Sequence, residues 1–154
     1  MKHWKAYLFW IALTEAVGAL AGWLTRTGTA AFSAAALQPP LSPPGWVFPV
    51  VWSILYALMG ISAARIWITP EKAGLNLFIS QLIVNFFWPL IFFNAGAYGF
   101  AALWLGFLWI LVLAMIWSFR RSDRTAARLL LPYLLWLTFA LYLNIGVWYL
   151  NSQI

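Results

Sequence analysis

The chain of 154 residues is 65% hydrophobic and 8% charged, with a mean hydropathy of +0.87. A water-soluble globular domain of this length does not have such a composition, which indicates an integral membrane protein in contact with the lipid bilayer. The chain has no cysteine and one histidine, which excludes disulfides, thiolate chemistry and the usual zinc sites. We expect no cofactor and no metal. The net charge of +6 comes from short segments beside apolar stretches, so membrane orientation explains it better than nucleic-acid binding.

Five stretches are apolar and long enough to cross a bilayer as helices, at about 20 residues each: 6–24, 46–64, 75–93, 97–119 and 129–150. The sequence therefore predicts an all-α membrane protein, a five-transmembrane-helix bundle that forms one domain over residues 1–154.

The basic residues predict an orientation. If the spans alternate, one side of the membrane receives Lys2, Lys5, Arg65, Lys72, Arg120, Arg121, Arg124 and Arg128. The other side receives only Arg26. This positive-inside pattern predicts a cytoplasmic N-terminus, with the first loop and the C-terminus outside. An alternative reading of the first span as a signal peptide rests on its basic start, but its length and Glu15 favour a membrane helix.

The first span carries Gly18 and Gly22 at a spacing that lets another helix approach closely. Contact with a second copy in a homodimer and packing inside the bundle both explain the pair. Glu15 is the only acid inside a span, which makes it a candidate functional residue; a protonated carboxyl bonded to a neighbouring helix is the alternative.

The segment 25–44 is the longest connection and holds mainly Ala, Ser, Thr and Pro. It is too apolar for a solvated linker, so we expect a lid over the outer mouth of the bundle, with a short helix around 30–37. The lid residues of interest are Phe32, Leu41, Pro43 and Pro44.

The second span begins after the rigid Pro43 and Pro44 and places Phe48, Trp52 and Tyr56 on one helical face. In the third span, Gln81, Asn85, Trp88 and Phe92 share a face that must look inward, because an amide in hydrocarbon needs a partner. That partner is either a neighbouring helix or a ligand.

The fourth span has few polar atoms and is expected to face lipid and structural neighbours. The fifth places Trp136, Ala140, Leu143 and Asn144 along one stripe. Aromatic rings with one or two amides would suit a flat hydrophobic ligand that carries a few carbonyl groups, although packing between helices explains the same spacing.

Three stretches together resemble the TspO/MBR family, which comprises tryptophan-rich sensory proteins and translocator proteins: PPGWVFPVVWSILYALMG at 43–60, QLIVNFFWPLIFF at 81–93 and RLLLPYLLWLTFALYLNIGVW at 128–148. The resemblance covers nearly the whole chain. It implies a five-helix bundle, often a homodimer, in a membrane that we expect to be bacterial. It also implies binding of porphyrins such as protoporphyrin IX, with haem, sterols and benzodiazepine-type drugs as ligands in parts of the family.

The positions that match the family's ligand pocket are Phe48, Trp52, Tyr56, Asn85, Trp88, Trp136, Ala140 and Leu143. By resemblance, Trp52 and Asn85 would hydrogen-bond the ligand and the other aromatic rings would stack on it.

The first loop departs from the family pattern. Phe32, Ser33, Gln38 and Leu41 stand where the family usually has Trp, Tyr, Lys and Trp. The loss of oxidisable rings makes the porphyrin breakdown attributed to some members less expected here.

Three functions remain open from the sequence. The first is a membrane receptor or sensor without conventional catalysis, with no catalytic residue assigned. The second is an enzyme that degrades porphyrin with light and oxygen, for which no acid–base pair is available or needed. The third is a transporter, although the chain shows one intramembrane acid and no internal repeat.

Overall fold

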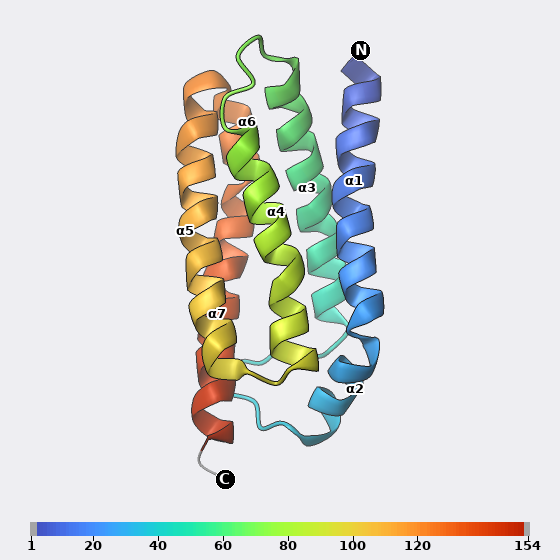
Figure 1. Ribbon diagram of the computed structural model, residues 1–154, viewed down its shortest axis with the longest axis vertical. Helices are drawn as coiled ribbons and strands as arrows, with labels where there is room; N and C mark the ends of the chain where they lie inside the picture. Colours follow the sequence, from blue (N-terminus) through green and yellow to red (C-terminus); the bar gives the residue numbers. More distant parts are fainter. Residues whose placement is uncertain (1–2, 153–154) are drawn as a thin grey trace.

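The computed structural model describes residues 3–152 and shows a bundle of helices without strands in that range (Figure 1). Five segments are long and apolar enough to cross a membrane: His3–Leu24, Val47–Ile68, Leu75–Asn94, Tyr98–Ser122 and Arg124–Asn151. The predicted all-α bundle of five membrane helices is confirmed.

The first three spans are formed by α1 (His3–Leu24), α3 (Val47–Ile68) and α4 (Leu75–Pro89), which continues as the π-helical turn η1 (Leu90–Asn94). The last two are α5 (Tyr98–Ser122) and α7 (Leu131–Asn151), which follows the short α6 (Arg124–Leu129). Helix α2 (Arg26–Ala35) lies in the first loop. The change to π-helix begins directly after Pro89, where the missing backbone N–H interrupts the regular pattern.

Close approach of α1 and α3 depends on small residues. A Cβ at Gly60 would lie 2.5 Å from the Cα of Ile11, and a Cβ at Gly18 would lie 2.3 Å from Cε2 of Tyr56. The Thr14 hydroxyl donates a hydrogen bond of 2.7 Å to the Tyr56 carbonyl. These contacts fix the position of α1 along the axis of α3. Glu15, next to Thr14 in the chain, therefore lies at the same depth in the bundle as Tyr56.

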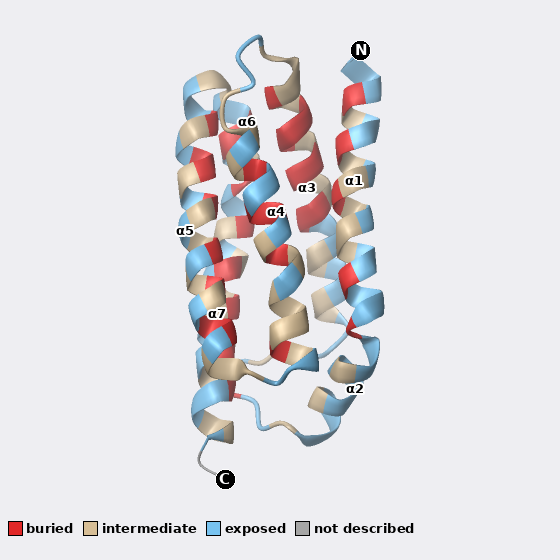
Figure 2. Ribbon diagram, viewed as in Figure 1, coloured by how far each residue is buried: buried red, intermediate tan, exposed pale blue. Residues whose placement is uncertain are grey.

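The most tightly packed part of the core lies in the half of the bundle that contains the start of α1 and α6. Buried residues of α3 run from Leu55 to Ile66, whereas the first two turns of this helix are only partly buried (Figure 2). Large apolar side chains on the outer faces, such as Leu103 and Leu135, are exposed, as expected for surfaces in contact with lipid tails.

A polar contact closes the end of the bundle near α6. The Asp123 carboxylate caps α6 by accepting from the backbone N–H groups of Thr125 and Ala126, and it accepts a 2.8 Å hydrogen bond from Nε of Arg65. Partial burial raises the pKa of Asp123, but the Arg65 guanidinium and the two backbone N–H groups lower it by more, so the pKa lies below its ordinary value. The contact ties α3 to the start of the last span.

The first loop closes the opposite end (Figure 1). The helix expected around 30–37 is present as α2, with its start and end earlier in the chain. After α2 the loop is fastened to α7: Asn151 accepts from the Leu37 N–H at 3.1 Å and donates to the Leu37 carbonyl at 2.8 Å. The Tyr142 hydroxyl donates to the Pro40 carbonyl at 2.7 Å. Two successive contacts therefore hold the loop across the bundle end.

The loop between α3 and α4, together with α6, lies at the same end as the start of α1 (Figure 1). These segments and the adjoining helix ends carry the basic residues of the described chain apart from Arg26, which begins α2 at the other end. The cytoplasmic assignment of the first end stays a prediction, and Lys2 lies outside the described residues.

Candidate functional site

A cavity of about 810 Å³ occupies the half of the bundle beneath α2 and the first loop. Helices α1, α3, α4, α5 and α7 contribute to its wall. The structure brings all eight predicted pocket residues to this one cavity: Phe48, Trp52, Tyr56, Asn85, Trp88, Trp136, Ala140 and Leu143. Its volume lies in the range of about 300–1,000 Å³ that is usual for small-molecule sites.

The first loop forms the roof of the cavity. Phe32, Pro43 and Pro44 line it, and the Phe32 ring packs against Phe92 with a centroid distance of 5.2 Å. Leu41 does not line the cavity: 81% of its surface is exposed and its φ is 72°, a left-handed backbone conformation. Three of the four predicted lid residues therefore face the cavity, and Leu41 lies on the outer side of the loop.

Aromatic rings of α3 and α7 form one wall. The rings of Trp52 and Trp136 meet nearly at right angles, with centroids 6.5 Å apart. Phe48 packs on Trp136 at 5.9 Å and Tyr56 on Trp52 at 5.6 Å. Nε1 of Trp136 is buried and has no hydrogen-bond partner among the described residues. This wall offers aromatic stacking area.

Asn85 lies in a buried hydrogen-bonded chain that joins α3, α4 and α7. Its Oδ1 accepts from the Tyr56 hydroxyl at 2.6 Å, and its Nδ2 donates to the Tyr133 hydroxyl at 2.7 Å. The Tyr133 hydroxyl in turn donates to Oε1 of Gln81 at 2.8 Å. Gln81 and Asn85 therefore face inward as predicted, and their side-chain amides form hydrogen bonds with residues of neighbouring helices. A hydrogen bond from Asn85 to a ligand stays a prediction.

The second amide also has protein partners. Nε1 of Trp88 donates to Oδ1 of Asn144 at 3.0 Å, and Nδ2 of Asn144 donates to the Tyr98 carbonyl at 2.9 Å. The Trp88 ring stacks on Phe92 with a centroid distance of 5.1 Å. These contacts hold the indole of Trp88 in a fixed position beside the cavity.

The wall formed by α1 was not predicted from the sequence. Glu15, Gly18, Ala19 and Gly22 all line the cavity, at spacings of three or four residues that place them on one stripe of α1, and Arg26 at the start of α2 lines it as well. This spacing is visible in the sequence, but nothing there shows which neighbour the stripe faces. Gly18 packs inside the chain against Tyr56, whereas a Cβ at Gly22 would meet nothing within 4 Å. A dimer contact through the two glycines stays a prediction.

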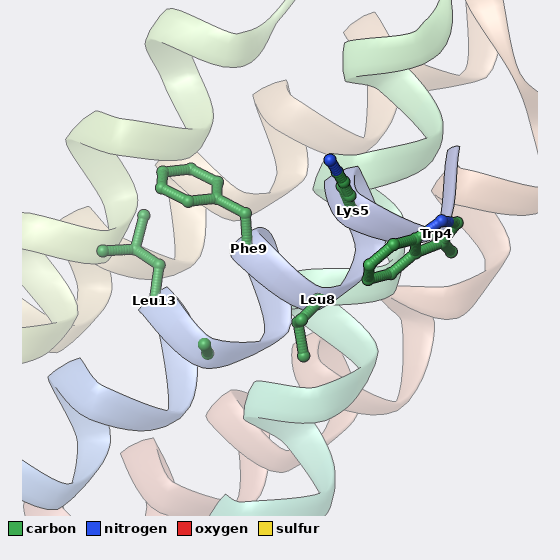
Figure 3. Close-up of a pocket in the computed structure, with 6 residues that line it drawn as sticks. Trp4, Lys5, Leu8, Phe9 and Leu13 are labelled. Carbon is green, nitrogen blue, oxygen red and sulfur yellow. The ribbon is translucent and has the colours of Figure 1, made fainter. Parts of the chain in front are cut away.

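A second hollow lies on the outside of α1 and is lined by Trp4, Lys5, Leu8, Phe9, Ala12 and Leu13 (Figure 3). All of these residues belong to the same helix. The hollow is therefore a groove between side chains on an outer face, and it is separate from the residues of the cavity.

The cavity lining carries few charged or metal-binding groups. Among residues 3–152, no three His, Cys, Asp or Glu side chains gather where they could hold a metal ion. The groups that line the cavity are mainly aromatic and aliphatic, with Glu15 and Arg26 as its charged residues. Such a wall can stack on a flat ring and orient its polar substituents.

Comparison with known proteins gives a consistent result. The sequence model of the TspO/MBR family matches residues 10–150. The chain is 34% identical to the tryptophan-rich protein TspO of Chlorobaculum tepidum, over 92% of each chain. It is 40% identical to protein CrtK of Rhodobacter capsulatus, over 74% of each chain, and 38% identical to the translocator protein of Homo sapiens, over 72% of this chain and 69% of the human one.

Proposed function

Since the chain belongs to the TspO/MBR family, we propose that it is an integral membrane receptor that binds porphyrins such as protoporphyrin IX, or related flat hydrophobic ligands, in the cavity beneath the first loop. The observation that carries the proposal is the cavity itself: about 810 Å³, roofed by the loop and walled by aromatic rings. Relatives named translocator protein and tryptophan-rich sensory protein support a role in recognising or moving a ligand.

The aromatic wall supplies the main attraction for such a ligand. Trp52 and Trp136 are each partly buried and present ring surface to the cavity. Stacking of a ligand ring on such a surface contributes about 0.5–1.5 kcal/mol per aromatic pair beyond the area buried. Because Asn85 and Asn144 already bond to protein groups, the cavity keeps its shape before the ligand enters. Such a preformed site lowers the ordering cost of binding.

The test is a titration of the purified protein with protoporphyrin IX in the dark, followed by porphyrin absorbance. Trp52→Leu should weaken binding by about tenfold, which corresponds to about 1.4 kcal/mol of lost stacking. Trp117→Leu is the matched control, because Trp117 is 61% exposed and does not line the cavity. Equal affinities of the two variants, or no saturable binding by the wild type, would contradict the proposal.

Asn85→Ala is a less direct test of the cavity, because it also removes hydrogen bonds that join three helices. Ala140→Leu adds volume at a buried position that lines the cavity and leaves those bonds intact. It should weaken porphyrin binding by filling space. Repeating the titration under light separates a receptor from the degradative alternative, since a receptor leaves the porphyrin absorbance band unchanged.

A further inference from the structure

The polar groups of the cavity differ in whether the protein already satisfies them. The amides of Asn85 and Asn144 and the hydroxyl of Tyr56 have protein partners on neighbouring helices. Glu15 has neither a hydrogen bond nor an ion pair among residues 3–152, in which the one ion pair joins Arg65 and Asp123. The carboxylate of Glu15 therefore remains available to a ligand as the acidic group of the cavity wall.

The place of Glu15 in the fold is well defined. Thr14 and Gly18 both contact Tyr56, so this part of α1 is held against α3 at the level of the hydrogen-bonded chain. Glu15 is half-buried and lies in the wall of the cavity. Within a membrane a carboxylate is costly unless a cation or a hydrogen-bond donor approaches it.

Arg26, at the start of α2, provides the opposite charge in the cavity lining. It follows Glu15 by eleven positions in the chain, beyond the end of α1, and it lies at the end of the cavity closed by the first loop. Its guanidinium stacks over the Trp23 ring at 4.4 Å and donates to the Trp23 carbonyl, which keeps it at the rim. An acidic group of a ligand would therefore be drawn toward the loop end and away from Glu15.

Small residues leave space for a ligand between the two charges. Ala19 and Gly22 lie between them, and a Cβ built on Gly22 would meet nothing within 4 Å, whereas the space beside Gly18 is filled by the Tyr56 ring. Across the cavity are the indole rings of Trp52 on α3 and Trp136 on α7. A flat apolar body fits between the smooth α1 stripe and these rings.

We propose that Glu15 is a specificity-determining residue that selects flat hydrophobic ligands carrying a protonated amine, with the amine at Glu15 and any acidic group toward Arg26. The inference rests on the proposed function, because it concerns the same cavity. It adds the chemical class of the substituent, a primary or secondary ammonium group, which the aromatic wall cannot distinguish from a neutral group of the same size.

The experiment compares two matched probes on the full chain in detergent. In both, one propionate of protoporphyrin IX is converted to a methyl ester and the other to an amide; one amide carries an aminoethyl group and the other a propyl group. The probes have nearly the same size and differ by one positive charge. The wild type should bind the aminoethyl probe about tenfold more tightly than the propyl probe, as expected for a hydrogen bond to a charged partner.

Glu15→Gln should reduce this preference to less than about twofold, whereas Glu71→Gln, in the exposed loop after α3, should retain it. Because the ratio is measured within each variant, a general loss of affinity cancels. An unchanged ratio in Glu15→Gln, with both probes still bound, would overturn the role of Glu15 and leave the proposed function standing. No saturable binding of either probe by the wild type would overturn the proposed function and the inference that rests on it.

Discussion

Replacement of Gly18 by alanine tests how α1 is held against the cavity. A Cβ at this position would lie 2.3 Å from Cε2 and 2.5 Å from Cδ2 of Tyr56, whereas carbon atoms in ordinary contact are about 3.5–4.0 Å apart. The ring would have to move by about 1.2 Å to restore that contact. It cannot do so freely, because its hydroxyl bonds to Asn85 and its face packs on Trp52. Either the ring leaves these partners or α1 moves away from α3.

Overpacking of this kind costs about 1–3 kcal/mol, and loss of the hydroxyl bond to Asn85 about 0.5–1.5 kcal/mol. Alanine also favours a helix over glycine by up to about 1 kcal/mol. Gly22→Ala is the matched control: it has the same gain in helix propensity, and its Cβ would meet nothing within 4 Å. The difference between the two variants therefore isolates the steric contribution.

The assay is reversible unfolding of both variants in mixed detergent micelles, followed by circular dichroism. Gly18→Ala should be less stable than Gly22→Ala by about 1–3 kcal/mol. Equal stabilities would refute the close packing of α1 on Tyr56. If Gly22→Ala were the more damaging change and also altered the oligomeric state, the glycine pair would belong to a contact between copies.

Three further predictions concern the polar contacts. Trp88→Phe keeps a ring but leaves Oδ1 of Asn144 without its donor, so it should cost about 1–3 kcal/mol of unfolding free energy; a loss as small as that of Trp117→Phe would contradict this. Asn151→Ala removes both bonds to the loop backbone and should speed hydrogen exchange there by about fivefold, whereas unchanged exchange would mean that other contacts hold the loop. Because the folded-state pKa of Asp123 lies below its ordinary 3.8, its stabilisation is complete above about pH 4 and is lost as the pH falls through the lowered value. Asp123→Asn should flatten that acidic part of the stability profile, by at most about 1 kcal/mol for a partly exposed pair, and an unchanged profile would show that the pair contributes nothing.

The fold could be predicted because the bilayer leaves few choices. An apolar stretch such as 97–119 must form a helix in lipid, where its backbone groups have no other partners. The helix α6 was not expected, because the segment 124–128 is rich in charge and reads as a loop. Its start depends on the Asp123 cap and on the Ser62 hydroxyl, which donates to the Ala126 carbonyl at 2.7 Å from the distant α3. Such a tertiary contact has no signature in the local sequence.

The candidate site could be predicted where the spacing of aromatic residues marks an inward face, as for Trp52 and Trp136. The partners of Asn85 could not, because an amide in a membrane helix needs a hydrogen bond but its sequence does not say from where. Tyr133 supplies one of them from α7, 48 residues away. The stripe that begins at Glu15 was missed because small residues in a membrane helix are common, and only the assembled bundle shows that they border a cavity.

The two sides of the cavity are stabilised in different ways. We therefore expect one side to determine the affinity for flat ligands and the other to determine which substituents are preferred. The wall of α3, α4 and α7 is cross-linked by buried hydrogen bonds through Asn85 and Asn144, so its rings are fixed before a ligand arrives. That wall can attract any flat apolar molecule, because stacking depends little on its substituents. The opposite wall has the small residues of α1 and two opposite charges, Glu15 on α1 and Arg26 at the start of α2. A charge left without a partner in a membrane is unfavourable, so the proposed role of Glu15 is to discriminate between ligands that pair with it and ligands that do not. Members of the family that share the aromatic wall but differ along this stripe should therefore bind similar ring systems with different substituents.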